Sequence, residues 1–86
     1  MPNPNDPNFG KPDEAQRFPT KGELAVRLDF NPSQEGVVYD IKRHSAALID
    51  LCEKLKAKDP RLASLAQTAY EEAAIWAVKA ATALKA

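Results

Sequence analysis

Residues that can bind a small anion gather in the stretch from Arg27 to Lys42. An aromatic ring, Phe30, directly precedes a predicted helix, and the cation of Lys42 follows about three turns inside that helix. The backbone N–H groups at the helix start, around Ser33 and Gln34, add a local positive field that suits a phosphate. Together these groups predict a binding site for a small anionic ligand.

The chain offers no comparable set of catalytic groups. It contains no Gly-rich phosphate loop, no catalytic-triad spacing and no metal signature. His44 has no second ligand at metal spacing, and Cys52 falls among apolar residues of a helix, as a core residue does. Glu71 and Glu72 are adjacent, so their side chains point about 100° apart on a helix and do not serve one substrate as acid and base. We therefore predict no enzymatic activity, no cofactor and no metal ion.

Charge and composition exclude several classes of partner. Twelve basic residues balance twelve acidic ones, so the surface as a whole does not favour duplex DNA. No apolar run approaches the ~20 residues of a membrane span, and the Asn- and Pro-rich start lacks the regions of a signal peptide. The single cysteine, Cys52, excludes a disulfide within the monomer. We expect a protein that stays in the reducing cytosol where it is made.

The N-terminal part differs in composition from the rest. Residues 1–20 contain five of the seven prolines among polar residues, which predicts a flexible or draped arm over residues 1–23. From Leu24 to Phe30 every second residue is apolar, the period of a short strand or extended segment with one buried face. The ligand-binding domain is therefore expected to span residues 24–86.

Two helices are predicted beyond this segment. They span about residues 32–58 and 60–84. Asn31-Pro32 and Asp59-Pro60 each place a capping side chain before a proline that suits the first helical position, and Gln34 stands where a capping box requires it. Because Asp59-Pro60 leaves almost no loop, the second helix is expected to fold back antiparallel. The predicted fold class is all-α, an antiparallel two-helix hairpin preceded by an extended N-terminal arm.

The predicted core of this hairpin is thin. Ten of the last 24 residues are alanine, which favours a helix but buries little apolar area, at roughly 25 cal/mol per Å². The predicted seams comprise Val38, Ile41, Ser45, Leu48, Cys52 and Leu55 in the first helix and Leu62, Ala66, Ala69, Ala73, Trp76, Ala80 and Ala83 in the second. Trp76 is expected to anchor the hairpin or an oligomer. We expect further protomers to cover so light a core, unless the alanine-rich side simply faces solvent.

Several short motifs occur in an order that resembles a known family. Phe-Asn-Pro-Ser, Ile-Lys, Ala-Ala-Leu-Ile-Asp-Leu and, most recognisably, Glu-Glu-Ala-Ala-Ile-Trp-Ala are arranged as in the phage-encoded cyclic-nucleotide sponges that counter the bacterial CBASS and Thoeris systems. The chain is more similar to the anti-CBASS branch, and the resemblance covers residues 30–84. It implies a homohexamer that sequesters cyclic dinucleotides such as cyclic GMP-AMP between protomers, with cyclic trinucleotides as further ligands of some members. It also implies action in the cytoplasm of the infected bacterial host, without cleavage of the messenger.

The resemblance also implies roles for individual residues. The family's aromatic residue before the first helix and its lysine within that helix fall, by order in the chain, on Phe30 and Lys42. Most members have tyrosine at the upstream position, so Phe30 keeps the stacking face and loses the hydroxyl. Tyr39 is a second candidate platform for a base, and stacking of this kind contributes ~1–3 kcal/mol per base. Arg27 or Arg43 can offer a planar fork to a phosphate or to a guanine edge.

Other interpretations stay open at this point. Phe30 continues the alternating apolar face and would pack there equally well, and Lys42, next to Arg43, has the surroundings of a solvated charge. For the whole chain, the alternative to a sponge is a small structural or adaptor protein whose alanine-rich helix docks on a larger protein partner. An adaptor is expected to be poorly stable alone and indifferent to nucleotides. A sponge is expected to be oligomeric by itself and to be stabilised by a cyclic dinucleotide.

Overall fold

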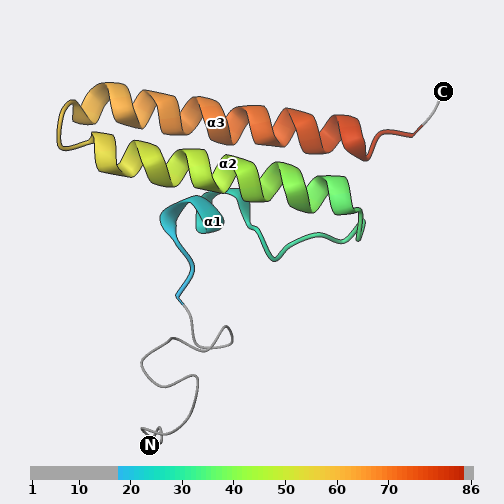
Figure 1. Ribbon diagram of the computed structural model, residues 1–86. Coiled ribbons are helices and arrows are strands. Elements are labelled where there is room, and N and C mark those ends of the chain that lie inside the picture. The colour runs from blue at the N-terminus through green and yellow to red at the C-terminus, as the bar shows by residue number, and fades with distance from the viewer. Residues whose placement is uncertain (1–17, 85–86) are drawn as a thin grey trace, which may run out of the picture.

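Three helices make up the computed structural model, which describes residues 18–84. They are α1 (Lys21–Val26), α2 (Gly36–Leu55) and α3 (Pro60–Ala81). The helices α2 and α3 lie side by side and antiparallel, and α1 packs mainly on α2 (Figure 1). Residues 18–84 contain no strand, which confirms the all-helical prediction. The predicted arm lies for the most part outside the described residues.

The helix α1 replaces the predicted extended segment, and that prediction is wrong. The hydroxyl of Thr20 accepts a hydrogen bond from the Glu23 N–H at 3.1 Å, and the Glu23 carboxylate accepts one from the Thr20 N–H at 2.9 Å. This reciprocal capping box starts a helix at Lys21. Four alternating apolar residues are too few to outweigh such a local signal. The expected domain boundary between residues 23 and 24 falls inside α1.

The end of α1 is a tight left-handed turn at Arg27, whose φ is 52°. The N–H groups of Arg27 and Leu28 donate back to the carbonyls of Leu24 and Glu23, at 3.3 and 3.0 Å. This pair of bonds is the Schellman arrangement, in which glycine is the usual left-handed residue because it has no Cβ. Arginine occupies the position here. The turn redirects the chain toward the start of α2.

The predicted start of the first long helix is also corrected. The helix α2 begins at Gly36, and its N-cap residue Glu35 makes no side-chain capping bond. The Asn31 side chain instead donates to the Glu35 carbonyl at 3.0 Å, and the Ser33 hydroxyl accepts from the Glu35 N–H at 3.2 Å. Gln34 has a left-handed backbone, with φ 57°. Local side-chain bonds thus hold residues 31–35 in a loop in place of a first helical turn. The helix ends at Leu55, before residue 58.

The turn between the long helices matches the sequence prediction. Asp59 is the N-cap of α3, and its carboxylate accepts a hydrogen bond from the Leu62 N–H at 2.9 Å. Pro60 occupies the first helical position, where a backbone N–H has no acceptor within the helix, so proline sacrifices no hydrogen bond there. The helix ends at Ala81, three residues short of the predicted end.

The two long helices face each other through a different side from the predicted seams. The buried residues are Val38, Lys42, Ala46, Ile49 and Cys52 in α2 and Ala63, Gln67 and Ala74 in α3. Of the predicted seams, Val38 and Cys52 are buried, Ile41 packs against the core, and Ser45 and Ala66 are half-buried. The other seam positions are exposed, and Trp76, with 60% of its surface exposed, does not anchor the hairpin. The physical reason is α1, whose Val26 joins the cluster of Ala46, Ile49 and Ala74 and draws that side of the hairpin into the core.

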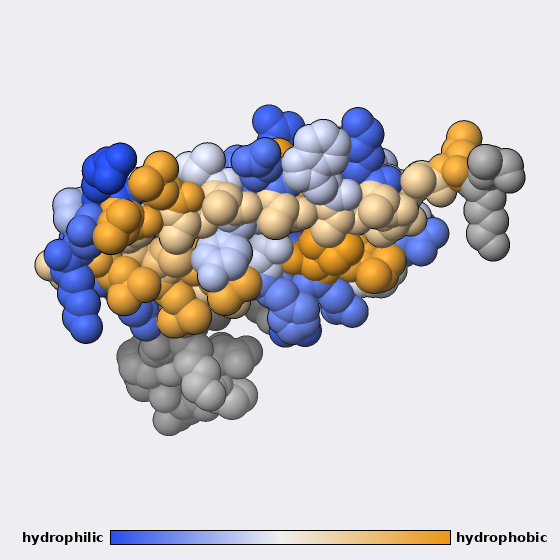
Figure 2. Space-filling view, turned by 90° about the horizontal axis from the view of Figure 1, so that it is seen from above, coloured by the Kyte–Doolittle hydropathy of each residue, from blue (hydrophilic) through white to orange (hydrophobic). Residues whose placement is uncertain are grey.

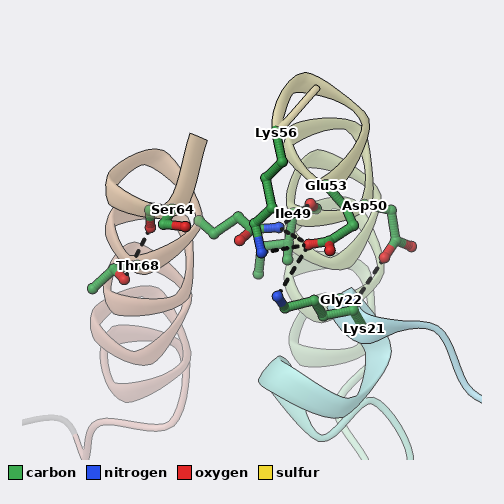
Figure 3. Close-up of polar contacts among 9 residues, drawn as sticks. Lys21, Gly22, Ile49, Asp50, Glu53, Lys56, Ser64 and Thr68 are labelled. Atoms are coloured by element: carbon green, nitrogen blue, oxygen red, sulfur yellow. Dashed lines mark hydrogen bonds and ion pairs between the residues drawn. The ribbon is translucent and has the colours of Figure 1, made fainter. Parts of the chain in front are cut away.

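Polar contacts fix α1 on α2 (Figure 3). The Gly22 N–H donates to the Asp50 carboxylate at 2.8 Å, and the Lys21 ammonium pairs with Glu53 at 3.0 Å. A Cβ added at Gly22 would overlap the carbonyl oxygen of Ala46, so only glycine lets the two backbones approach this closely. The position of α1, and of the turn that follows it, is consequently set by α2.

The side of the hairpin turned away from α1 carries a band of apolar side chains along α3 (Figure 2). Exposed apolar residues at steps of three and four continue this surface, which we call the open face: Leu48, Leu51 and Leu55 of α2 and Leu62, Leu65, Ala69, Ala73, Trp76 and Ala80 of α3. These positions include most of the predicted second seam. Most residues of the predicted second seam therefore lie on the outside of the hairpin.

Candidate functional site

A cavity of about 480 Å³, open to solvent, lies between the end of α1 and the first turn of α2. We call it the turn cavity, and it is lined by Pro19, Glu23, Leu24, Arg27, Leu28, Asp29, Phe30 and Tyr39. Three of the residues singled out from the sequence, Arg27, Phe30 and Tyr39, share its wall. The left-handed turn brings Arg27 and Phe30 together, and the start of α2 supplies Tyr39.

The two aromatic rings of the turn cavity are accessible. Phe30 exposes 60% of its surface and Tyr39 exposes 45%. Exposed rings of this kind can stack a base on their free faces, whatever the identity of the base. The Phe30 ring is supported from within the protein by the Lys42 ammonium, which lies 5.5 Å from the ring centroid.

The Lys42 side chain is buried, with only 8% of its surface exposed. Its ammonium donates to the carbonyl oxygen of Arg27 at 3.1 Å and to that of Phe30. Burial lowers the pKa of Lys42 below its ordinary value of 10.5, and the nearby positive charge of Arg27 lowers it further. Lys42 thus lies beneath the turn, whereas the sequence suggested a solvated charge or a ligand contact.

The exposed cation of the turn cavity is Arg27. Its guanidinium forms no ion pair with any residue among 18–84. It also borders a second cavity of about 310 Å³, between α1 and α3, whose lining is mostly apolar and includes Ile75 and Val78. The backbone of Arg27 adopts a conformation that costs a non-glycine residue energy, and such residues are frequent at functional sites.

Two carboxylates in the turn cavity were not singled out from the sequence. Glu23 accepts the capping hydrogen bond of Thr20, and Asp29 precedes Phe30 on the exposed side of the turn. Their charges reduce the positive potential that Arg27 creates. Two signals in the sequence could have indicated these residues. Asp29 is adjacent to Phe30, and Glu23 completes a Thr20-x-x-Glu23 capping pattern.

The remaining predicted site residues lie apart from the turn cavity. Ser33 borders a third cavity, of about 280 Å³, with Phe30 and Lys42, and its hydroxyl donates to the Asn31 side chain at 2.6 Å. The expected free N–H group of Gln34 is bonded to the Asn31 carbonyl at 3.1 Å, so that part of the anion site is absent from its predicted place. Arg43 pairs loosely with Asp40, at 4.0 Å, and lines none of these three cavities.

Several other features of residues 18–84 bear on chemistry. No group of three or more His, Cys, Asp or Glu side chains in this part of the chain could hold a metal ion. Cys52 is buried in the helix interface, and His44 is exposed. Within the same residues, no helix has the length and hydropathy needed to cross a bilayer.

The fold and the cavity define a helical-hairpin domain with an aromatic and cationic site on one side. The model of the family described as Acb2/Tad1, hairpin domain, matches residues 21–82. The chain therefore belongs to the Acb2/Tad1 hairpin family, the anti-CBASS and anti-Thoeris cyclic-nucleotide sponges. The match begins at Lys21, the first residue of α1, so the short helix is part of the family domain. No curated protein and no solved structure matches the chain.

Proposed function

We propose that this protein sequesters cyclic oligonucleotide second messengers without cleaving them and thereby inhibits a bacterial anti-phage immune pathway. The observation that carries the proposal is the turn cavity in a member of the Acb2/Tad1 hairpin family, where two accessible aromatic rings stand beside the Arg27 guanidinium, which forms no ion pair within residues 18–84. The proposed ligands are cyclic dinucleotides such as cyclic GMP-AMP, with cyclic trinucleotides as further candidates. The proposed place of action is the cytoplasm of the infected bacterial host.

The chemistry of the cavity suits such a ligand. A cyclic dinucleotide presents two bases with flat faces and two phosphodiesters with one negative charge each. Phe30 and Tyr39 offer stacking surfaces, and Arg27 offers a planar fork that matches the oxygens of a phosphate or the edge of a guanine. Ser33, Lys42 and Arg43 complete the set of residues proposed for the ligand region.

The proposed assembly is a symmetric homo-oligomer, a hexamer by analogy with the family. The turn cavity is open to solvent, so a dinucleotide bound to a single protomer would keep part of its surface exposed to water. A second protomer would close the site. The open face supplies the apolar surface that such an association needs, since its leucines and Trp76 are exposed in the isolated chain.

Calorimetric titration with a panel of cyclic di- and trinucleotides tests this function. We expect at least one cyclic dinucleotide to bind, and we expect it to be recovered intact after the protein is denatured by heat. Recovery of linear products would show a phosphodiesterase instead. Absence of binding across the panel would refute the proposal.

The open face also fits the second candidate function, an adaptor that docks on a larger protein. The two candidates differ in what they predict for the isolated chain. A sponge forms a discrete oligomer and gains thermal stability from a cyclic dinucleotide. An adaptor remains monomeric at micromolar concentration, and its unfolding temperature does not respond to nucleotides.

A further inference from the structure

We propose that Asp29 selects guanine among the bases of a cyclic dinucleotide, by accepting hydrogen bonds from the two N–H donors on the Watson–Crick edge of that base. This inference rests on the proposed function, because it names the base that the turn cavity recognises. The observation behind it is an acidic wall in a cavity proposed to bind an anion.

The charged groups that line the turn cavity are the guanidinium of Arg27 and the carboxylates of Glu23 and Asp29. A cyclic dinucleotide carries two negative charges, so a carboxylate beside it costs affinity through like-charge repulsion. This cost is offset where the carboxylate accepts hydrogen bonds from the ligand, because bonds to a charged acceptor are among the stronger ones. The ligand offers two kinds of donor, the N–H groups of its bases and the free hydroxyls of its riboses.

The two carboxylates differ in how far they are already engaged. The Glu23 carboxylate accepts a hydrogen bond from the Thr20 N–H at 2.9 Å and so belongs to the cap of α1. The Asp29 side chain is exposed, and its carboxylate takes part in no hydrogen bond or ion pair within residues 18–84. Both oxygens of Asp29 can therefore accept hydrogen bonds from a ligand.

The backbone fixes the place of Asp29 beside the Phe30 ring. The Arg27 carbonyl accepts a hydrogen bond from the Phe30 N–H at 2.9 Å, which closes a four-residue turn with Leu28 and Asp29 at its centre. The Leu28 N–H donates to the Glu23 carbonyl at 3.0 Å and joins this turn to α1. Because Asp29 and Phe30 line the same cavity, a base stacked on the Phe30 ring presents its edge where the carboxylate lies.

Guanine is the base whose edge suits a carboxylate. It carries two adjacent donors, N1–H and the N2 amino group, which match the two acceptor oxygens of Asp29. Adenine and cytosine each place a ring nitrogen that is an acceptor next to their amino group, so a carboxylate facing that edge meets a repulsive lone pair. Uracil has a single N–H between two carbonyls. The Arg27 guanidinium suits the same base, since guanine presents the acceptors O6 and N7 on its neighbouring edge.

Calorimetric titration with cyclic GMP-AMP and cyclic di-AMP, which differ in one base, tests this role. We expect the wild type to bind cyclic GMP-AMP about tenfold more tightly, because adenine leaves one carboxylate oxygen of Asp29 without a donor. Equal affinity for the two ligands would overturn the inference and would assign the carboxylate to the ribose hydroxyls, which both ligands share.

Asp29→Asn is the informative variant. It replaces one acceptor oxygen by an amino donor, and one donor beside one acceptor is the pattern that suits adenine. We expect weaker binding of cyclic GMP-AMP and unchanged or tighter binding of cyclic di-AMP, a divergence that damage to the fold cannot produce. Full retention of the preference for cyclic GMP-AMP in this variant would contradict the role of Asp29.

Asp40→Asn is the matched control. Asp40 is exposed on α2 and does not line the turn cavity, so the same chemical change there removes a negative charge without touching the base. We expect it to leave the ratio of the two affinities unchanged. An equal loss of preference in both variants would show that selectivity follows the overall charge of the protein and would refute a contact by Asp29.

A change on the ligand covers the case in which Asp29→Asn does not fold. Cyclic IMP-AMP lacks only the N2 amino group of the guanine, and we expect the unmodified protein to bind it about tenfold more weakly than cyclic GMP-AMP. Equal affinity for these two ligands would overturn the inference and leave the proposed function in place. Absence of binding by all three ligands would refute the proposed function itself, and the role of Asp29 with it.

Discussion

The Phe30 ring stands at the wall of the turn cavity, with its outer side free and its inner side near the Lys42 ammonium. We predict that Phe30→Ala weakens cyclic-dinucleotide binding at least tenfold, about 1.4 kcal/mol, because a stacking surface is lost. The salt dependence of affinity should stay the same, since stacking involves no charge pair. Calorimetry at two ionic strengths provides the measurement.

Phe18→Ala is the matched control for this change. Phe18 exposes 90% of its surface and does not line the turn cavity, so its removal should leave affinity unaltered. Equal affinity for the wild type and Phe30→Ala would exclude Phe30 as a stacking platform and leave Tyr39 as the candidate ring.

Glu53 should make the stability of the fold depend on acid pH. Its carboxylate accepts a hydrogen bond from Gln67 and pairs with Lys56 and Lys21, and these contacts hold its pKa at about 2, below the ordinary value of 4.5. A carboxyl group with a lowered folded-state pKa stabilises the fold above its unfolded pKa and loses that effect as pH falls through the folded one. The contribution of Glu53 should be complete at neutral pH, decline below about pH 4.5 and vanish below about pH 2.

Thermal unfolding of the wild type and Glu53→Gln at pH 7 and at low pH measures this contribution. The variant should melt at a lower temperature at pH 7, and the gap should narrow as Glu53 becomes protonated in the wild type. Glu72→Gln, at an exposed position of α3, should show no gap at either pH. A gap for Glu53→Gln that is independent of pH would show that the contacts of Glu53 do not depend on its charge.

At the scale of elements, the approach of α1 to α2 depends on the absence of a side chain at Gly22. We predict that Gly22→Ala lowers stability by about 1–3 kcal/mol, because the added Cβ overlaps the backbone of Ala46 and pushes α1 away. Ligand binding should weaken as well, since α1 carries the turn. Denaturant unfolding and calorimetry report the two effects.

Gly36→Ala provides the comparison for Gly22→Ala. Nothing lies within 4 Å of a Cβ built at Gly36, which is the first residue of α2. Alanine favours the helix and restricts the unfolded chain, so stability should stay the same or rise slightly. Equal losses in both variants would mean that α1 does not pack on α2 as described.

The elements also show how far sequence reasoning reaches in this chain. The start of α3 was predictable because Asp59-Pro60 is a purely local signal. The buried face of each long helix was not predictable. Each helix carries a second apolar stripe, on the open face, and the packing of α1 decides which of the two stripes is buried. The Thr20-to-Glu23 capping box could have revealed α1, but four alternating apolar residues supported an extended segment equally well.

The candidate site, too, could be predicted from the sequence only in part. Arg27, Phe30 and Tyr39 were predicted as candidates, and the structure brings them to one cavity. The burial of Lys42 could not be predicted, because a lysine in a helix is ordinarily solvated and its two carbonyl partners lie 12 and 15 residues away in the chain. Hydrogen bonds to carbonyl groups of a distant loop produce no periodic pattern of residues that a sequence could show.

For the whole molecule, the open face should govern self-association without governing the fold of the protomer. We predict that Trp76→Ala and Ala73→Glu each dissociate the proposed oligomer at micromolar concentration while helix content is retained, since both residues are exposed in the protomer. Light scattering gives the mass, and circular dichroism gives the helix content. If Trp76 were a core residue of the protomer, Trp76→Ala would instead unfold the protein.

Thr68→Glu is the control for a charge on α3. Thr68 is exposed on a different side of the helix, where its hydroxyl donates to the Ser64 carbonyl at 3.1 Å (Figure 3). Its replacement should leave the mass of the oligomer unchanged. A wild type that is monomeric by light scattering would remove the basis for sites shared between protomers.

The left-handed backbone at Arg27 and the ligand contact proposed for its side chain would favour different residues at this position. Glycine adopts a φ of 52° without steric cost, whereas other residues in this region are disfavoured by about 1–2 kcal/mol. A variant library selected only for resistance to protease should therefore enrich glycine at position 27, and a library selected for retention of the messenger should keep arginine. Retention of arginine at this backbone angle would then show that selection for ligand binding outweighed selection for stability during the evolution of this protein.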